Sequence, residues 1–96
     1  MIEVRQTTVF SDWLTGLRDI NARTRILVRI RRLELGNPGD VKSVGGGVSE
    51  MRVDYGPGYR VYFVQQGKTV VILLCGGDKP TQDKDIATAQ QMAKEV

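Results

Sequence analysis

The sequence predicts one α+β domain spanning residues 1–96, in which a mainly antiparallel sheet packs against helices. Three observations support this prediction. Residues 10–35 show helical periodicity, short apolar runs separated by glycine-containing turns follow in the second half, and another helical pattern begins after Pro80. The 96 residues, of which 41% are hydrophobic, suffice for a single modest core. The predicted order is strand, two helices, three antiparallel strands and helix.

The first third of the chain predicts one strand and a helical hairpin. Residues 2–7 alternate apolar and polar side chains, as in a strand with one buried face. The first helix is indicated by apolar residues at helical spacing: Phe10, Trp13, Leu14 and Leu17. A second helix over Ala22–Leu35 has its apolar side formed by Ile26, Leu27, Ile30 and Leu33. Because the break between the helices is short, we expect a hairpin on one face of the sheet.

Arginines follow the opposite side of the second helix. Arg25, Arg29 and Arg32 line up there, and the only acidic residue of the helix, Glu34, comes near its end. A solvated helix face explains this pattern, since arginine has good helix propensity. A stripe that tracks phosphates explains it equally, because the positive potential is not cancelled by interleaved glutamate. Both interpretations stay open from the sequence.

A glycine-rich segment then leads to the sheet. We interpret Val41–Gly47 as a short, flexible connector that brings Lys42 near the polar face of the sheet. Its three successive glycines do not form a nucleotide loop, because the Gly-Lys-Ser/Thr signature and the strand-to-helix context are missing.

Three consecutive strands are predicted over Val48–Asp54, Tyr59–Gln65 and Thr69–Cys75. The third is apolar throughout, as expected of a central strand that is buried on both faces. A last helix, about Thr81–Lys94, is expected to cover its second face with the following small or apolar residues: Ile86, Ala89, Met92 and Ala93.

Alternation along the strands sorts their side chains by face. The set directed toward the helical hairpin is Met51, Val53, Val61 and Phe63, and the opposite set is Glu50, Arg52, Arg60 and Tyr62. Lys79 comes just after the third strand. We therefore expect the charged side chains to converge on a site for an anionic partner. A cross-strand salt bridge between Glu50 and an arginine explains the same spacing.

Composition narrows the classes of function. The formal charge is only +3, histidine is absent, and Cys75 is the one cysteine. These facts argue against a zinc site and an internal disulfide, so we expect no metal, no cofactor and a cytoplasmic protein. The longest apolar run, Val70–Cys75, is far too short to span a bilayer, and we expect no membrane partner.

Several stretches together identify a resemblance that covers nearly the whole chain. They are Trp13-Leu14, Leu17-Arg18-Asp19, Arg29–Leu33, Gly36–Asp40, Gly47–Arg52, Gly56–Tyr62, Leu73–Lys79 and Gln82–Ile86. In these residues the sequence resembles the RelE/ParE superfamily of toxins from bacterial toxin–antitoxin modules, and in particular its HigB-like branch of addiction-module killer proteins. The resemblance implies a RelE-like fold, whose order of elements matches the one predicted above.

The resemblance also implies an activity. Nuclease members of the superfamily inhibit translation by cutting mRNA in the ribosomal decoding site, without metal, through attack of a 2′-hydroxyl on the neighbouring phosphate. This chemistry needs a base, an acid and cations for the developing phosphorane charge. By resemblance, Arg60 of the Gly-Tyr-Arg motif stabilises the phosphate, Glu50 is the base, and Lys79 and Arg52 add positive charge. The residues expected to contact RNA or the ribosome are Lys42, Arg25, Arg29, Arg32, Tyr62, Asp78 and Gln82.

The sequence departs from the family pattern near its C-terminus. Several nuclease members place a tyrosine or histidine in or just before the last helix, and residues 80–96 contain neither. Asp78 and Gln82 are the nearest polar substitutes. Two alternatives to a nuclease therefore stay open, a ParE-like toxin that poisons DNA gyrase and a non-catalytic RNA-binding module. Either toxin implies a cognate antitoxin, which in the HigB-like branch is a helix-turn-helix (HigA-like) protein encoded next door.

Overall fold

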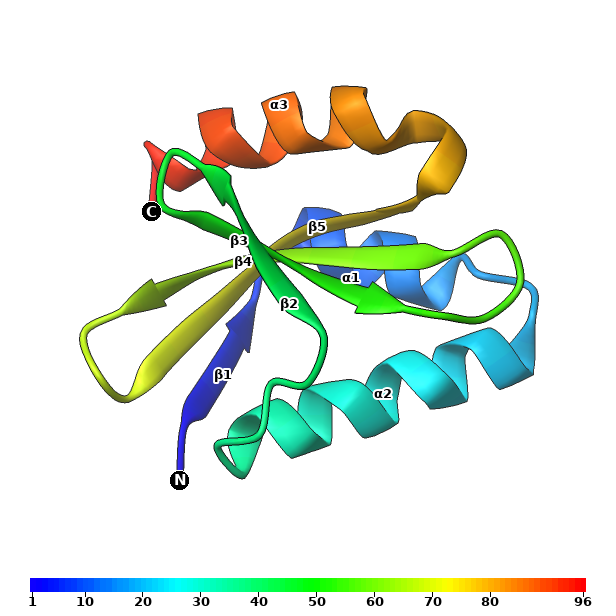
Figure 1. Cartoon of the computed structure of the whole chain (residues 1–96), viewed down its shortest axis with the longest axis horizontal. Helices are drawn as coiled ribbons and strands as arrows, with labels where there is room; N and C mark the ends of the chain where they lie inside the picture. The colour runs from blue at the N-terminus through cyan, green and yellow to red at the C-terminus, as the bar shows by residue number, and fades with distance from the viewer.

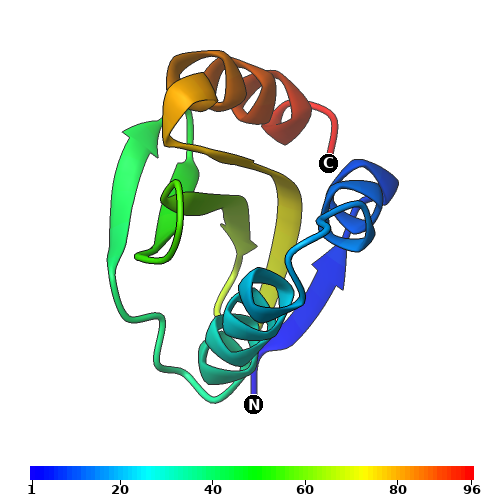
Figure 2. The same ribbon diagram turned by 90° about the vertical axis from the view of Figure 1, so that its right-hand side faces the viewer.

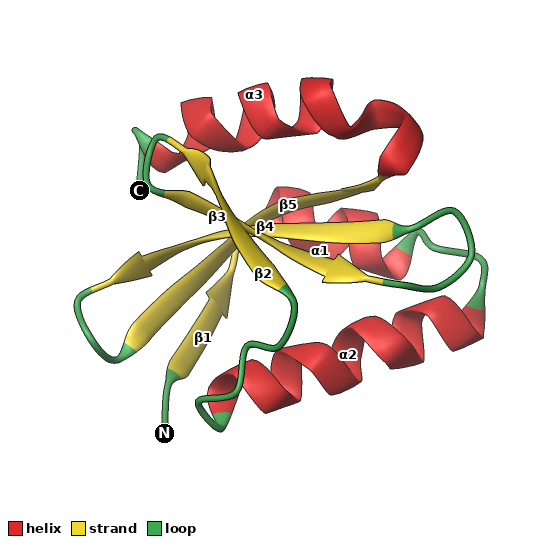
Figure 3. Cartoon of the chain, viewed as in Figure 1, coloured by secondary structure: helices red, strands yellow, loops and turns green.

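The computed structural model describes residues 1–96 and confirms the predicted α+β fold and order of elements, with one additional strand (Figure 1, Figure 3). A five-stranded sheet has the strand order β1-β5-β4-β3-β2, in which only the pairing of β1 with β5 is parallel. The elements are β1 (Glu3–Gln6), α1 (Thr8–Thr15), α2 (Ile20–Glu34), β2 (Val41–Gly45), β3 (Val48–Val53), β4 (Tyr59–Gln66), β5 (Val70–Asp78), the 3-10 helix η1 (Lys79–Thr81) and α3 (Gln82–Ala93).

Helices α1 and α2 cover one face of the sheet, as predicted (Figure 2). The core between them consists of Phe10, Leu14, Ile26, Leu33, Met51, Val53, Val61, Phe63, Val71 and Leu73. The side chains of β3 and β4 assigned to this face by alternation are all present, because a strand's period of two fixes the face of every residue. One residue of α2 was assigned wrongly: Leu27 is 52% exposed, since the buried side of α2 centres on Ala22, Ile26 and Leu33.

Helix α3 covers the opposite face, also as predicted. Ala89 is fully buried against Val48, Tyr62, Val64, Leu74 and Cys75, with Ile86, Met92 and Ala93 at the margin. The second core is smaller than the first and lies under a single helix. No helix is both long and apolar enough to cross a membrane.

The expectation of a flexible connector before β3 is wrong. Val41–Gly45 forms β2, which pairs antiparallel with β3, and Gly45, Gly46 and Gly47 turn the chain with φ values of 89°, 65° and 78°. Only glycine adopts such angles without strain. Val41 and Val44 are three residues apart and therefore lie on opposite faces, where they pack against different cores. Because these are the only apolar residues of β2 and each serves a different face, the sequence shows no apolar alternation there, and a bulge follows between Ser43 and Gly45.

The position and length of the last strand also differ from the prediction. β4 rather than β5 occupies the middle of the sheet, although β5 is internal, between β1 and β4. β5 runs through Gly76 and Gly77 to Asp78 instead of ending at Cys75. A Cβ on Gly76 would lie 2.3 Å from the Trp13 ring, and one on Gly77 would lie 1.8 Å from the Asp85 carboxylate. The two glycines therefore let α1 and α3 approach β5 from its two faces.

Candidate active site

A polar pocket of about 260 Å³ opens where β3 ends and β4 begins. Its lining residues are Asp40, Arg52, Val53, Asp54, Gly58, Tyr59, Arg60 and Lys79. The strand register explains this grouping, since Arg52 lies opposite Arg60, which in turn lies opposite Gly77 on β5, two residues before Lys79. The structure thus brings three of the four residues of the expected catalytic set, Arg52, Arg60 and Lys79, into one pocket.

The three cations are held differently. The Arg60 side chain is only 11% exposed, and its Nη1 donates a hydrogen bond of 3.0 Å to the Gly58 carbonyl oxygen. Arg52 Nη2 lies 3.1 Å from Asp40 Oδ1 in an ion pair whose members are 40% and 59% exposed. Lys79 is exposed and has no carboxylate partner. The pocket therefore offers one oriented guanidinium and one unpaired ammonium to an anion.

Glu50 lies beneath this pocket and is completely buried. Its Oε2 accepts a hydrogen bond of 2.9 Å from Gln82 Nε2 and lies 3.6 Å from Arg60 Nε, whereas its Oε1 has no hydrogen-bond partner. A buried carboxylate beside the guanidinium compensates the charge of Arg60 and restricts its orientation. In this arrangement Glu50 does not line the pocket and influences a bound anion only by orienting Arg60.

Gln82 and Asp78 join the site to the last helix. Gln82, the first residue of α3, contacts Glu50 and so fixes the start of the helix over the carboxylate. Asp78 ends β5 and accepts a hydrogen bond of 3.2 Å from the Thr81 hydroxyl, which also donates to Asp85 Oδ2 at 2.6 Å. These polar groups order the turn between β5 and α3, and neither Asp78 nor Gln82 lines the pocket of Arg60.

The sequence did not indicate the role of Tyr59, which precedes Arg60 in the Gly-Tyr-Arg motif. Tyr59 packs against the first core, on the same face of β4 as Val61 and Phe63, and it also lines the pocket at the end of the sheet. Burial raises the pKa of its hydroxyl, and the nearby carboxylates of Asp19 and Asp78 raise the pKa further. This shift favours the neutral hydroxyl, which can donate a hydrogen bond, and makes it a weaker acid than an ordinary tyrosine. In the sequence, only its position next to Arg60 connects Tyr59 with the site.

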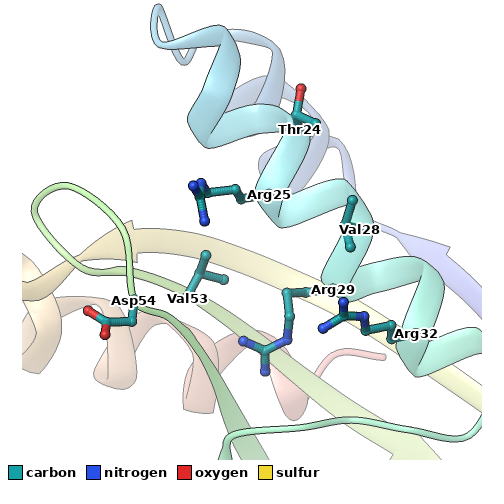
Figure 4. Close-up of a pocket in the computed structure, with 7 residues that line it drawn as sticks. All are labelled: Thr24, Arg25, Val28, Arg29, Arg32, Val53 and Asp54. Carbon is teal, nitrogen blue, oxygen red and sulfur yellow. The ribbon is translucent and has the colours of Figure 1, made fainter.

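The predicted arginine stripe borders a second groove, of about 240 Å³, between α2 and the end of β3 (Figure 4). Its lining residues are Thr24, Arg25, Val28, Arg29, Arg32, Val53 and Asp54. Arg29 has a structural role, because its guanidinium donates hydrogen bonds to the carbonyl oxygens of Arg52 and Pro38. Arg25 lies over the Tyr55 ring, 4.5 Å from its centroid, and Arg32 is exposed without an ion pair. The stripe is thus partly structural and partly free.

Two further residues of the expected binding set lie outside both hollows. Lys42 lies opposite Glu50 in the backbone register of β2 and β3, but its side chain is exposed at the edge of the sheet. Tyr62 is fully buried under α3, where burial and the Glu50 carboxylate raise the pKa of its hydroxyl. Nowhere in the chain do three or more aspartate, glutamate or cysteine side chains gather closely enough to hold a metal ion.

Two comparisons with known proteins identify the family of this chain. The family described as "Phage derived protein Gp49-like (DUF891)" matches residues 12–94, which include both hollows and the last helix. An uncharacterized protein of Haemophilus influenzae is 50% identical over 95 residues, which cover 99% of this chain and 96% of that protein. The chain therefore belongs to the phage-derived Gp49-like family (DUF891), a RelE/HigB-like family.

Proposed function

We propose that this protein is the toxin of a type II toxin–antitoxin module and a metal-independent, ribosome-dependent mRNA endoribonuclease that inhibits translation. One observation is the main support: Arg52, Arg60 and Lys79 line a single pocket together with Tyr59. Cations around a pocket favour a phosphate, and they favour the more highly charged phosphorane still more. Membership in a RelE/HigB-like family agrees with this chemistry.

The proposed roles follow from the position of each group. Arg60, oriented by Gly58 and Glu50, binds the non-bridging oxygens of the scissile phosphate, and Lys79 and Arg52 add positive charge. Tyr59 donates the proton that the leaving 5′-oxygen requires, in place of the absent C-terminal tyrosine or histidine. Glu50 removes the proton of the attacking 2′-hydroxyl when the ribosome displaces the start of α3 and breaks the contact with Gln82.

A second candidate function is favoured by the burial of Glu50. The Glu50 side chain is completely buried beneath α3 in the free protein, so the one base of the expected catalytic set is not accessible there. A ParE-like toxin that poisons DNA gyrase needs the fold and a basic surface but no base. An RNA-binding module without catalysis would show neither cleavage nor toxicity.

Sequencing of RNA ends after a brief induction separates these functions. We expect new 5′ ends within translated mRNA for the wild type, and their loss for Arg60→Ala and Lys79→Ala. The matched control is Arg5→Ala, since Arg5 is an exposed arginine on β1, at the opposite edge of the sheet from β2 and β3. If both pocket variants kept full growth inhibition, the nuclease proposal would be wrong. Gyrase-dependent DNA breaks with intact mRNA would establish the second candidate.

The proposed partners follow from the proposed function. A toxin that acts on translating ribosomes works in the cytoplasm and contacts the ribosome and mRNA. It also requires a cognate antitoxin, which we propose is a helix-turn-helix (HigA-like) protein. Co-expression of the protein encoded by the neighbouring gene should restore growth, and continued inhibition at equal expression would exclude that protein as the antitoxin.

A further inference from the structure

A further hollow, of about 340 Å³, shares Tyr59 with the pocket of Arg60. It lies along the end of β5, beyond the segment that pairs with β1, since that pairing stops at Leu73. We call it the Trp13 hollow. Its lining residues are Trp13, Leu17, Tyr59, Gly76, Gly77, Asp78, Thr81 and Asp85.

One side of the Trp13 hollow combines aromatic rings with a carboxylate. Trp13 lies so close to β5 that a Cβ on Gly76 would come within 2.3 Å of the indole ring. Asp78 is two residues farther along the strand, and therefore on the same face, and it lies opposite Tyr59 of β4. The centroids of the Trp13 and Tyr59 rings are 6.3 Å apart, in an edge-on arrangement. The indole, the phenol and the carboxylate thus border one space.

The Asp78 carboxylate has hydrogen-bonding capacity to spare. Thr81 has a single hydroxyl proton, and its oxygen lies 2.6 Å from Asp85 Oδ2 but 3.2 Å from Asp78 Oδ1. The shorter contact is the stronger one, so Asp78 Oδ1 receives only the weaker share of that proton. Asp78 Oδ2 has no hydrogen-bond partner in the protein, and the carboxylate forms no ion pair. Asp78 can therefore accept two hydrogen bonds from a ligand.

We propose that the Trp13 hollow binds the base of the nucleotide whose phosphate occupies the pocket of Arg60, and that this base is guanine. Guanine carries two adjacent donors on one edge, N1–H and the N2 amino group, which match the two oxygens of a carboxylate. Adenine and cytosine place a ring nitrogen, which repels a carboxylate, beside their one amino group, and uracil has a single N–H between two carbonyl groups. Stacking on the aromatic rings adds affinity for any base. The inference rests on the proposed function and gives that function a sequence preference.

A basic side chain of a protein fits the Trp13 hollow less well. Lysine or arginine would satisfy a carboxylate beside aromatic rings. The adjoining pocket, however, contains Arg52, Arg60 and Lys79, which repel a basic segment. A ligand that spans both spaces needs donors at one end and negative charge at the other, and a nucleotide has both.

Nucleotide binding to the free protein tests the proposal. Trp13 is the only tryptophan, so its indole N–H gives one reporter resonance in a ¹H–¹⁵N NMR spectrum. The probes are the 3′,5′-bisphosphates of guanosine, inosine, adenosine and cytidine, which carry a phosphate on either side of the ribose. Guanosine should bind about tenfold more tightly than inosine, which lacks only the N2 amino group. Asp78→Asn should weaken guanosine binding about tenfold and remove its preference over inosine, because the amide replaces one acceptor by a donor.

Asp83→Asn is the matched control, since it removes the same charge from an exposed aspartate of α3 that does not line the Trp13 hollow. It should keep the preference for guanosine. Thermal denaturation verifies that each variant is folded, and the four nucleotides on the wild type decide the question if Asp78→Asn is not. Equal binding of guanosine and inosine, no binding, or an equal loss in Asp83→Asn would overturn the proposal. Tighter binding of N-acetyl-arginine amide than of the guanosine nucleotide would overturn it in favour of a basic peptide.

The ends of cleaved RNA distinguish this inference from the proposed function. Guanine should be enriched next to the cut in cells that express the wild type, and Asp78→Asn should abolish the enrichment. Cleavage without a base preference, together with no guanosine binding, would overturn the inference and leave the nuclease intact. Guanosine-selective binding without any cleavage would refute the nuclease and support the base site.

Discussion

Replacement of Glu50 by alanine should destabilise the protein severely, although Glu50 is a charged residue of the sheet. Glu50 is completely buried, and its closest cationic neighbour, Arg60, is only 11% exposed. Glu50→Ala leaves the guanidinium buried without its counter-charge and deprives the Gln82 amide of its acceptor. Breaking a buried pair in this way costs about 3–5 kcal/mol of the free energy of unfolding.

The lower end of that range applies here, because one side of Arg60 opens to the pocket and its Nη1 keeps the bond to Gly58. We therefore expect a loss of about 3 kcal/mol for Glu50→Ala. Glu50→Gln keeps the shape of the side chain and can still accept from Gln82, so its loss should be smaller. The double variant Glu50→Ala/Arg60→Ala should lose less than the sum of the single variants, because it removes the isolated charge.

The exposed pair between Asp40 and Arg52 provides the control. Arg52 is 40% and Asp40 is 59% exposed, so solvent screens the interaction, and Asp40→Ala should cost no more than about 1 kcal/mol. Urea denaturation followed by far-UV circular dichroism measures both variants under identical conditions. If Glu50→Ala and Asp40→Ala proved equally mild, Glu50 would not be a buried partner of Arg60, and the proposed orientation of the guanidinium would be refuted.

Three further predictions follow from close contacts in the structure. Gly77→Ala should lower the free energy of unfolding by about 1–3 kcal/mol, since overpacking in a dense region has that cost. The added Cβ would lie 1.8 Å from the Asp85 carboxylate, so the loss should be smaller in an Asp85→Ala background. An equal loss in that background would contradict this contact. Burial raises the pKa of Cys75 from 9.0 to about 11, so stability should decrease as pH rises from about 9 to 11, and a disulfide reagent at pH 8 should modify the thiol only after unfolding. Rapid modification of the native protein would show that the thiol is accessible. Arg29→Ala should lower the free energy of unfolding by about 1.5–3 kcal/mol, because two backbone carbonyl groups lose a charged donor. Arg32→Ala, at an exposed position, should change it by no more than about 0.5 kcal/mol in the same urea titration. Equal effects would mean that Arg29 is a solvated residue.

Patterns with a regular period were predicted correctly. The alternation of β3 and β4 assigned Met51 and Val61 to one core and Tyr62 to the other, because a strand allows only two faces. The helical period likewise located both halves of the hairpin. Where apolar alternation is missing the prediction was wrong: β2 has only two apolar residues, which face opposite sides, and the glycines at the end of β5 resembled a strand terminus.

The residues of the candidate site could be predicted from the sequence, but how deeply each one is buried could not. Arg52, Arg60 and Lys79 share a pocket, and the sequence indicated this because alternation put both arginines on one face and Lys79 directly after the last strand. The register that sets Arg52 opposite Arg60 came only from the structure. Tyr59 joins that pocket although alternation directs it toward the core, since a side chain at the end of a strand is covered on one side only.

The sequence by itself determined the α+β class, the order of the elements, the faces of the strands and a basic set of residues on one of them. These features depend on local periodicity and on charge, which each segment carries with it. Only the tertiary structure decided that Glu50 is enclosed between Arg60 and Gln82, that Arg29 bonds to backbone carbonyls, and that Leu27 remains exposed. Burial and pairing depend on which distant segment covers a residue, and here α3 closes over Glu50 from 32 positions away along the chain.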